Sequence, residues 1–546
     1  MSHTERFLPG RRRYLQWGLA LAAGPAGLSA CQPHQRTVAR TLAEVAPQWS
    51  GVNVGRGHLL REPPDWAGAM PGPSHRVLVV GSGVAGLSTA WHLREGGITD
   101  VAVLELEDGA GGNARAHRLG GLPCPLGAHY LPVPDERNAV LQAFLAALGL
   151  CQREGGKTVW NERHLVHAPQ ERLFFQGRWL DGLMPSSDDD PELRRQLKVM
   201  HDRVEALRAG SRMPTFSAEL PPQAAQLDRM PFSQWLAAQG IDHALLLHYL
   251  DYCCRDDYGS PLQAVSAWAG LHYFAARHGF AAPGMPAERE GVLTWPEGNA
   301  WLTQAMARPL AGQLHAGQVV RQARRTASGW EVLVHDARTG RWLRWTCAEL
   351  VMATPLFVAE RVLGAEAPQA LLSVLPHMQW APWLVSNLLL DGPLEDRAGA
   401  PPAWDNVLHD SPALGYVEAG HQSLSPAMGP KVITHYWALG AADAQQTLAQ
   451  RRRLHGDDVN QWAGRVLTDL QAVHPDLGRK LQAMTLQRHG HAMAVPVPGL
   501  RTLPALQALQ QGARRLHFAH SDLSGYSVFE EAFWHGWRVA RQLAKA

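Results

Sequence analysis

The chain lacks a surplus of charge of either sign. Its 546 residues carry 51 Lys and Arg against 49 Asp and Glu, and charged residues make up only 18% of the sequence. Four of the arginines (Arg6, Arg11, Arg12 and Arg13) lie near the N-terminus beside a single acid, so the remaining chain is close to neutral. Because nucleic-acid-binding proteins usually carry a basic surplus, we expect no nucleic acid among the partners.

Cysteine is also scarce, with six residues in the whole chain. This density excludes a small fold held together by disulfides. No spacing among the cysteines fits a zinc site, so no metal is expected. We interpret the adjacent pair Cys253-Cys254 as buried packing rather than a redox pair. The hydrophobic content of 46%, with Gly 52 and Pro 38, instead indicates a globular, loop-rich protein.

Long hydrophobic runs are missing as well. The apolar stretch from Trp17 to Leu28 is short and is interrupted by Gly24-Pro25, so it does not fit a stable transmembrane helix. It follows the basic residues Arg11-Arg12-Arg13, which is the pattern of an export signal.

The residues of this leader suggest an export route and a location. Adjacent arginines before Tyr14-Leu15 resemble a bacterial twin-arginine signal, and Leu28-Ser29-Ala30-Cys31 resembles a lipobox whose Cys would be lipidated. We expect residues 1–31 to be an export signal read by the twin-arginine machinery. The protein would then be periplasmic, with the signal or a lipid on Cys31 as its only membrane attachment. A generic basic leader with an accidental cysteine is the alternative.

A βαβ unit follows a predicted linker at 32–73. Two β-branched runs, Arg76–Val80 and Val101–Leu104, flank a stretch with helical periodicity at 87–95. Further strands are predicted at 318–321, 330–334, 350–352 and 431–437, with a helix over 442–472. The segment 160–290 is expected to be mainly helical.

A glycine-rich turn joins the first strand to the helix, and it reads Gly81-Ser82-Gly83-Val84-Ala85-Gly86. In this pattern the first glycine permits the tight turn, the second admits a pyrophosphate, and the third lets helix and strand pack closely. The N-terminus of the helix then attracts the phosphates. Glu105, at the end of the second strand, can accept hydrogen bonds from an unphosphorylated ribose, which disfavours NADP and leaves NAD or FAD.

Separated segments, in the correct order, resemble the flavin amine oxidase superfamily, which includes monoamine and polyamine oxidases, protoporphyrinogen oxidase and phytoene desaturases. The resemblance spans about 75–546 and implies FAD as the cofactor. It rests on Val103–Arg115, Pro125–Tyr130, Trp295–Asn299, Val319-Val320, Ala348–Pro355, Phe518–Asp522 and Phe529–Gly536.

The resemblance implies an α/β fold with a discontinuous Rossmann-type FAD-binding domain and an α+β substrate-binding domain. We expect the first domain over 74–160, 291–362 and 485–546, and the second over 161–290 and 363–484. The flavin should lie between them. In such proteins the acid at the position of Asp522 holds the ribityl chain, and the helix beginning near Phe529 directs its N-terminus at the flavin.

The expected cofactor-binding residues combine the glycine turn with this resemblance. They are Gly81, Gly83, Val84, Ala85, Gly86, Glu105, Gly111, Gly112, Asn113, Arg115, Gly127, Ala128, His129, Tyr130, Val320, Asp522, Phe529 and Glu530.

Several positions depart from the superfamily pattern. Asn113 stands where an arginine is usual, and His520 and Glu531 stand where glycines are usual. The stretch Pro382–Leu388 carries no lysine, although many amine oxidases place one there to bind a water near the flavin. These departures concern the substrate and its chemistry more than the cofactor.

No catalytic residue is identified from the sequence. The candidates are His129 and His520 for proton transfer and Trp383 for the wall of the substrate pocket. His272, His489 and His491 also fall in segments expected near the flavin, although each can equally be a hydrogen-bonded structural histidine. Tryptophan is unusually common, and the candidates for pocket walls or core packing are Trp268, Trp295, Trp301, Trp380, Trp383, Trp437 and Trp534.

One acidic cluster stands out in the expected substrate domain, from Asp251 to Gly259. If the segment is helical, Asp251 and Arg255 pair across one turn. Asp256 and Asp257 then lie near the helix C-terminus, where acids oppose the helix dipole. They either guide a cationic substrate or form a solvated face.

The predicted function is that of an exported FAD-dependent oxidoreductase that takes a hydride from a small molecule, foremost an amine or polyamine. One alternative is a phytoene-desaturase-like enzyme acting on C–C bonds of an apolar substrate. Another is a flavin-bearing electron-transfer or assembly protein without a substrate. An acid-rimmed aromatic pocket favours the amine, and a long apolar tunnel favours the desaturase.

Overall fold

The computed structural model describes residues 42–210, 224–277, 279–280, 291–422 and 429–545. The expected export signal, including Arg11–Arg13 and Cys31, lies outside these residues. Within the described ranges, no helix combines the length and the apolar character needed to cross a bilayer.

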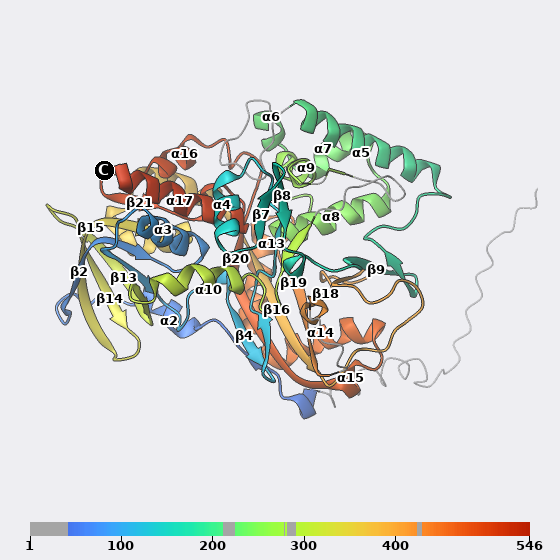
Figure 1. The fold of residues 1–546 in the computed structure, drawn as a ribbon, viewed down its shortest axis with the longest axis horizontal. Coiled ribbons are helices and arrows are strands. Elements are labelled where there is room, and N and C mark those ends of the chain that lie inside the picture. The colour runs from blue at the N-terminus through green and yellow to red at the C-terminus, as the bar shows by residue number, and fades with distance from the viewer. Residues whose placement is uncertain (1–41, 211–223, 278, 281–290, 423–428, 546) are drawn as a thin grey trace, which may run out of the picture.

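Two large sheets, each assembled from distant segments, organise the two halves of the molecule (Figure 1). In the first sheet, β12, β3, β2, β15 and β21 run parallel, and β13 and β14 extend it antiparallel beside β15. Its strands are β12 (Leu314–Ala316), β3 (Val101–Glu105), β2 (Met70–Val80), β15 (Arg341–Met352), β21 (Leu516–Phe518), β14 (Trp330–Asp336) and β13 (Gln318–Arg325).

The first sheet is covered on both faces, as its continuous apolar runs require. Val77 and Val79 of β2 join one core cluster, whereas Leu78 and Val80 join another on the opposite face. The first cluster includes α3 (Val84–Glu95), α4 (Ala139–Ala147), α10 (Ala300–Ala307) and α17 (Phe529–Lys545). The second includes α11 (Leu356–Leu363), α12 (Gln369–Val374) and α16 (Pro504–Gln511).

The second sheet has eight strands, mostly antiparallel, in the order β1-β20-β16-β19-β18-β17-β9-β10. Leu384 and Val385 of β16 point to opposite faces and join different clusters, since side chains alternate along a strand. The strands are β1 (Gln48–Trp49), β20 (Leu481–Val495), β16 (Gln379–Leu390), β19 (Lys431–Ala438), β18 (Tyr416–Glu418), β17 (Asp405–Leu408), β9 (Glu171–Phe175) and β10 (Arg178–Asp181).

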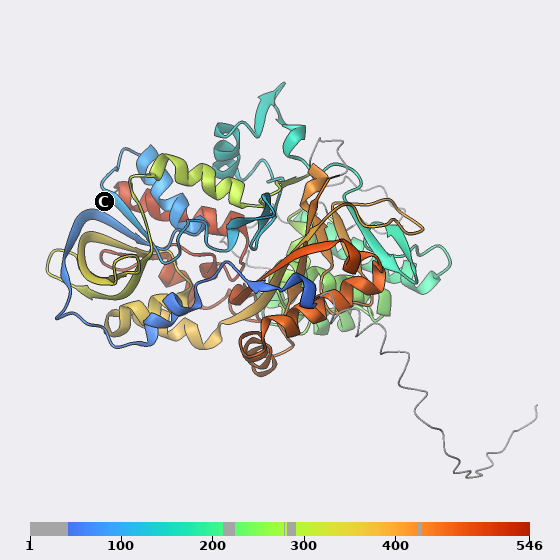
Figure 2. The ribbon, with the colours of Figure 1, turned by 90° about the horizontal axis from the view of Figure 1, so that it is seen from below.

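Helices flank the second sheet too (Figures 1 and 2). Those that share a core with Val385 are α5 (Pro191–Gly210), α7 (Phe232–Ala238), α8 (Ala244–Tyr258) and α9 (Ala267–Ala275). Those that pack with Leu384 are α13 (Ala444–Gly456) and α14 (Val459–Val473). Three two-stranded ribbons complete the fold: β4 (Ala116–Leu119) with β5 (Leu122–Pro125), β6 (Tyr130–Pro132) with β11 (Val292–Thr294), and β7 (Cys151–Glu154) with β8 (Lys157–Trp160).

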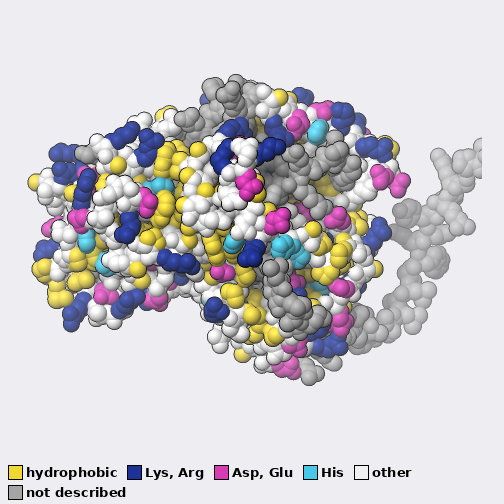
Figure 3. Space-filling model, in the orientation of Figure 1, with side chains coloured by type: hydrophobic (Ala, Val, Ile, Leu, Met, Phe, Trp, Pro, Cys, Tyr) yellow, Lys and Arg dark blue, Asp and Glu magenta, His cyan; other side chains and the backbone are white. Residues whose placement is uncertain are grey.

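Basic and acidic side chains both occur on each half of the face drawn in Figure 3. This distribution agrees with the near-neutral composition. The five cysteines among the described residues are all buried and unbridged, which includes the adjacent pair Cys253-Cys254.

The predicted strands are all present, but four segments differ from expectation. The helix expected over 442–472 is two helices, because Asp458 caps a new one: its side chain accepts from the Gln461 backbone at 3.0 Å. The range 160–290 also contains β9 and β10. The range 485–546, assigned to the cofactor domain, begins within β20 of the second sheet.

The fourth difference concerns the predicted linker at 32–73. Its described part holds β1, the short helix α2 (Val54–His58), a 3₁₀ turn η1 (Leu59–Arg61) and the start of β2. Parallel pairing of β1 with Thr485 and Leu486 of β20 ties this segment to the second sheet. Composition rich in Pro and Gly could not reveal such a distant partner.

Candidate active site

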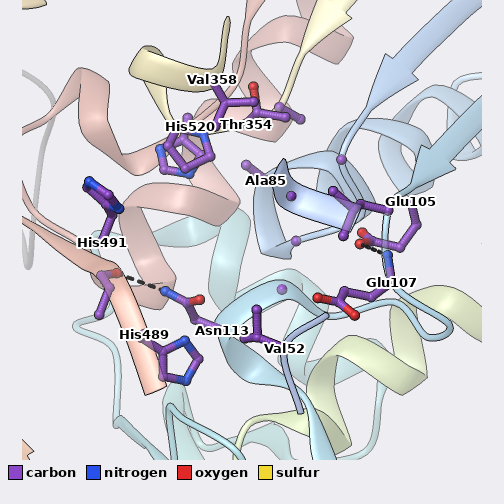
Figure 4. A pocket seen from close by; sticks show the side chains of 18 of the residues that line it. Val52, Ala85, Glu105, Glu107, Asn113, Thr354, Val358, His489, His491 and His520 are labelled. Carbon is purple, nitrogen blue, oxygen red and sulfur yellow. Dashed lines mark hydrogen bonds between the residues drawn. The ribbon is translucent and has the colours of Figure 1, made fainter. Parts of the chain in front are cut away.

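A cavity of about 730 Å³ lies where the first sheet meets strands β16 and β20 of the second. It opens at the carboxyl ends of β2 and β3, where parallel α/β sheets bind their ligands. Figure 4 shows Ala85, Glu105, Asn113, His489 and His520 around it.

The glycine turn forms one wall of this cavity. Gly81 has a φ of +99°, and a Cβ there would lie 2.7 Å from the carbonyl oxygen of Ala353. A Cβ on Gly86 would lie 1.9 Å from the oxygen of Gly81, so this glycine serves helix packing and does not line the cavity. Since α3 begins at Val84, its unpaired N–H groups face a space that suits a diphosphate.

Glu105 is held in a fixed orientation at the end of β3. Its Oε2 accepts from the Ser82 backbone at 2.9 Å, and its Oε1 accepts from the Glu107 backbone at 2.9 Å. Oε2 also accepts from the Ser82 hydroxyl at 2.5 Å, so Oε1 is the oxygen that keeps a further lone pair. The group lines the cavity with Val320 and fits the ribose hydroxyls of an adenosine.

Asp522 presents a buried acceptor to the same space. Its Oδ2 accepts from the Leu356 backbone at 2.9 Å and from Trp380 Nε1 at 3.2 Å. Its Oδ1 has no hydrogen-bond partner within the described ranges, although the residue is only 1% exposed. His520 Nδ1 lies 3.2 Å from this oxygen, but that nitrogen accepts from the Asp522 backbone and so has no proton to donate. An unpaired buried carboxylate oxygen is costly, and a hydroxyl of a bound ribityl chain would satisfy it.

A second cavity of about 140 Å³ continues from the first. Asn113, Ala128, Asn299, His489 and Phe529 line both. The residues found only in the second include Gly127, His129, Tyr130, Asp256, Asp257, Arg277, Trp383, Tyr436 and Glu530.

Aromatic rings make one side of the second cavity. His129 stacks on Tyr436 with 4.3 Å between ring centroids, and Trp383 and Tyr130 stand beside them. Burial lowers the pKa of His129 to about 3, so the ring is neutral. A neutral, stacked imidazole fits a wall better than the proton-transfer role considered from the sequence.

Carboxyl groups make the opposite side. Asp256 lies in the last turn of α8, and its Oδ2 accepts from the Tyr130 hydroxyl at 3.2 Å. Burial, aided by neighbouring Asp257, raises the pKa of Asp256 to about 7. Asp257 itself is paired with Arg277 at 2.9 Å. These acids face the cavity, which excludes the solvated-face interpretation.

The local structure around these acids was predicted correctly. The segment is helical, Asp251 pairs with Arg255 at 3.0 Å, and the helix ends at Gly259 with a left-handed φ of +71°. Acids at the C-terminus of a helix are unfavourable, so their burial there has to be compensated by Tyr130 and Arg277.

Glu530, in the first turn of α17, is the third carboxyl of the second cavity. It is 3% exposed, and its Oε1 has no hydrogen-bond partner among the residues that the structure describes. Burial raises its pKa to about 7, with Arg277 opposing the shift. Two groups titrating near neutrality therefore border a small aromatic cavity next to the larger one.

A family model described as flavin containing amine oxidoreductase matches residues 84–544, which is most of the chain. The chain belongs to this family. It is accordingly an FAD-dependent oxidoreductase, and the glycine turn, Glu105 and the unpaired oxygen of Asp522 fit that cofactor.

Individual relatives share shorter stretches. The chain is 40% identical to the bovine peroxisomal N(1)-acetyl-spermine/spermidine oxidase over 98 residues, or 18% of each chain. It is 26% identical to the coproporphyrinogen III oxidase of Mycobacterium leprae over 312 residues, which are 54% of this chain and 63% of that one. The matched regions thus span less than two thirds of these relatives.

Solved structures confirm the fold. A putrescine oxidase with bound putrescine superposes with a TM-score of 0.65 at 16% identity, covering 87% of this chain and 99% of the other. Cyclohexylamine oxidase from Brevibacterium oxydans superposes with a TM-score of 0.62, also at 16% identity, over 87% and 99% of the two chains.

The structure explains the departures from the family pattern. Asn113 donates from Nδ2 to the carbonyl of Ala492 at 2.8 Å, so it ties its loop to β20 (Figure 4). Arg115 lines neither cavity; it donates to the Gly112 carbonyl at 3.1 Å and pairs with Glu107 at 3.7 Å. It supports the loop rather than facing the cofactor space.

Glu531 points away from the cavities into a buried network. The Ser524 hydroxyl donates to Glu531 Oε2, and Ser524 Oγ lies 2.7 Å from His535 Nε2. This network holds the turn after Asp522. His520 lines the larger cavity, and its Nδ1 accepts from the Asp522 backbone at 3.1 Å.

No lysine lines either cavity within the described residues, and β16 turns Trp383 and Val385 toward the smaller one instead. Of the tryptophans considered, only Trp380 and Trp383 reach a cavity, and Trp295 stacks on Trp301 at 5.0 Å. His272 lines neither cavity and stacks on Tyr526, whereas His489 and His491 line the larger one.

Some lining residues were not anticipated. Tyr436 and Arg277 come from unremarkable stretches of sequence, and no local signal marks them. Asn299 ends one of the segments that resemble the superfamily, but no role was predicted for it; it donates to the Tyr130 carbonyl at 2.7 Å. Seven of the residues between Val52 and Arg61 also line the larger cavity.

Proposed function

We propose that this enzyme oxidises a small aliphatic amine, taking a hydride from the carbon next to nitrogen. The observation that carries the proposal is the pair of buried carboxyls, Asp256 and Glu530, in an aromatic cavity adjoining the FAD cavity. A carboxylate buried among rings attracts an ammonium group and gains a counter-charge from it.

The size of the second cavity supports a small substrate. Water in the liquid occupies roughly 30 Å³ per molecule, so about 140 Å³ holds only a handful of heavy atoms. A long polyene or a tetrapyrrole would need far more room. Carboxyl groups on its wall also disfavour the apolar tunnel that a desaturase needs, and a second cavity adjoining the FAD cavity disfavours a protein without a substrate.

The protein's own groups would divide the work between binding and positioning. FAD supplies the hydride acceptor. The turn at Gly81–Gly83, Glu105 and Asp522 would hold its adenosine, diphosphate and ribityl parts. Asp256 and Glu530 would bind the ammonium and take up a proton, because a group with a pKa near 7 can exchange protons at neutral pH.

The aromatic side of the cavity would orient the substrate. Tyr436, Trp383 and the neutral ring of His129 exclude water and attract a cation through their faces. No protonated histidine is needed for this role, which agrees with the lowered pKa of His129.

Anaerobic mixing of the holoenzyme with a panel of mono- and diamines tests the proposal. We expect the yellow flavin to bleach with short alkylamines and diamines, and not with an apolar polyene. Asp256→Asn should slow bleaching at least tenfold, while the exposed Asp189→Asn should behave as wild type. Bleaching by dithionite but by no amine would refute amine oxidation.

We further propose that residues 1–31 direct export and that Cys31 carries a lipid, on the sequence pattern alone. Arg12→Lys separates every adjacent arginine pair while keeping the charge, so it should retain the protein in the cytoplasm, whereas Arg6→Lys should not. Radiolabelled palmitate should label the wild type and not Cys31→Ser. Export of Arg12→Lys at the wild-type rate, or labelling of Cys31→Ser, would contradict this.

A further inference from the structure

The segment before the glycine turn crosses the FAD cavity. We define residues 48–62 as the strap. In Figure 2 this blue segment runs from the orange strands of the second sheet to the first sheet. At one end β1 pairs with β20, the Ser50 N–H donates to the Leu486 carbonyl at 2.8 Å, and Arg488 stacks over Trp49 at 4.6 Å.

The other end of the strap is fastened to the first sheet. The Asn53 N–H donates to Glu107 Oε1 at 2.9 Å, and Arg56 donates to the Leu106 carbonyl at 3.1 Å and pairs with Asp108 at 2.8 Å. Arg321 Nε donates to the Glu62 carbonyl at 2.7 Å. The strap therefore bridges the two sheets across the space between them.

Between these anchors the strap contributes directly to the cavity wall. Its lining residues are Val52, Asn53, Val54, Gly57, His58, Leu60 and Arg61. In Figure 4 Val52 is drawn between Asn113 and Glu107, two residues that line the same cavity. The family match begins only at residue 84, so the strap lies outside the part that the family model covers.

Basic side chains gather where residues 58–61 of the strap pass α13 and β20. His58 and Arg61 of the strap, with His455 and Arg488 from α13 and β20, all line the cavity. No ion pair joins any of these four to a carboxylate within the described ranges. Arg488 instead donates to the His455 carbonyl at 3.3 Å. Uncompensated cations around a cavity attract an anion.

FAD carries such an anion in its diphosphate. Asn113 replaces the family's usual arginine, and its side chain donates to the Ala492 carbonyl. The loop Gly111-Gly112-Asn113 therefore offers less positive charge than is usual in the family. We propose that the strap closes over bound FAD as an outer wall of its site, with Arg61 and Arg488 supplying positive charge to the diphosphate. This inference depends on the cofactor and not on the proposed amine substrate.

Linkage between the strap and FAD follows from this arrangement. If the ordered strap holds FAD, then FAD must stabilise the ordered strap by the same free energy. Loosening the strap should therefore speed FAD release, and removing FAD should expose the strap to proteases.

The first test needs no variant. Trypsin can cut after Arg56 and Arg61 within the strap, and after Arg153 and Lys157 in the exposed β7–β8 ribbon. Holoenzyme and FAD-free protein from riboflavin-starved cells are digested in parallel. We expect FAD to slow the strap cuts at least tenfold and to leave the ribbon cuts unchanged. Equal strap cleavage in both forms would overturn the proposal.

The second test measures FAD release, followed as the rise in flavin fluorescence after dilution of the holoenzyme. We expect Arg56→Ala, which loses an anchor, and the double variant His58→Ala/Arg61→Ala, which loses charge, to release FAD about tenfold faster. Arg153→Ala removes an arginine from the ribbon and should match wild type. Wild-type release from both strap variants would overturn the proposal, whatever the enzyme does with amines.

Discussion

The charge state of two side chains decides what the smaller cavity can bind. Asp256 and Glu530 have pKa values raised to about 7 by burial, while Asp257 is already paired with Arg277. At neutral pH each of the two groups is therefore partly protonated rather than fixed as an anion. An entering cation favours their ionised forms, so binding and deprotonation are coupled.

This coupling gives a pH prediction for a ligand whose own charge is constant. An alkylguanidinium stays positive throughout the range. Its dissociation constant should fall about tenfold per pH unit up to pH about 7 and then level off, since only the ionised carboxyl attracts it. Titration of flavin absorbance with the guanidinium from pH 5.5 to 8.5 measures the profile.

Variants identify the group responsible. Asp256→Asn should bind the guanidinium at least tenfold more weakly at pH 8 and flatten the profile, and Glu530→Gln should have a smaller effect of the same kind. The exposed Asp189→Asn provides the control. A profile that keeps its full slope in both Asp256→Asn and Glu530→Gln would mean that another group governs cation binding.

At the scale of elements, close helix packing holds the glycine turn in place. Gly536 of α17 lies against α3: a Cβ there would come within 2.4 Å of the Ala85 carbonyl and 2.6 Å of Ser88 Cβ. Ala85 lines the cofactor cavity, so this contact transmits any shift of α17 to the cavity wall.

Two glycine-to-alanine substitutions should therefore differ in their effect on stability. Alanine is favoured over glycine in a helix by up to about 1 kcal/mol, and Gly456 at the end of α13 has free space around it. Gly456→Ala should be neutral or stabilising. Gly536→Ala should lower the free energy of unfolding by about 1–3 kcal/mol through overpacking. Urea unfolding measures both, and a stable Gly536→Ala would show that the helices can separate freely.

Elements whose signals are local were predictable from the sequence. The glycine turn, its flanking strands and the helix ending at Gly259 each follow from a few adjacent residues, and all are present. The strap was not predictable, because its order depends on pairing with residues about 435 positions away, as for Val52 and Gln487. Tyr436 and Trp383 reach the substrate cavity only through the register of β16 with β19, which no local pattern encodes.

The direction in which a side chain points was also not predictable from the sequence. The sequence identified Asp256 and Asp257 but left open whether they faced solvent or substrate, because the choice depends on Tyr130 and Arg277 from other segments. Likewise Glu531 replaces a glycine beside the flavin without blocking it, since Ser524 draws its side chain into the core.

For the whole molecule, buried histidines and buried carboxyls oppose each other in the dependence of stability on pH. Burial lowers the pKa of His129 to about 3 and that of His248, His474, His489 and His491 to about 4. Unfolded histidines titrate near 6.5, so between about pH 4 and 6.5 the unfolded chain binds more protons there. Stability then rises with pH.

The carboxyls act in the other direction. Unfolded Asp and Glu release their protons near pH 4, whereas Asp256 and Glu530 keep theirs until about 7 in the fold. The folded chain thus binds more protons through this interval, and these two groups reduce stability as pH rises toward 7. Below pH 6.5 the more numerous histidines prevail, and above it only the carboxyl effect remains.

The free energy of unfolding should therefore pass through a maximum near pH 6.5 and then fall by about 1–2 kcal/mol by pH 8. Each of the two carboxyls contributes on the order of one pKa unit or less to this fall. Urea unfolding of FAD-free protein at half-unit steps from pH 5 to 8.5 measures this curve. The double variant Asp256→Asn/Glu530→Gln should show a shallower decline above pH 6.5 than wild type and keep the rise below it, because buried Asp405, whose pKa is also raised by burial, is still present. A wild-type curve that climbs steadily to pH 8 would mean that these carboxyls are already ionised in the fold. The cation-binding profile would then have to be independent of pH as well. Both measurements thus test whether Asp256 and Glu530 keep their protons in the folded protein up to about pH 7.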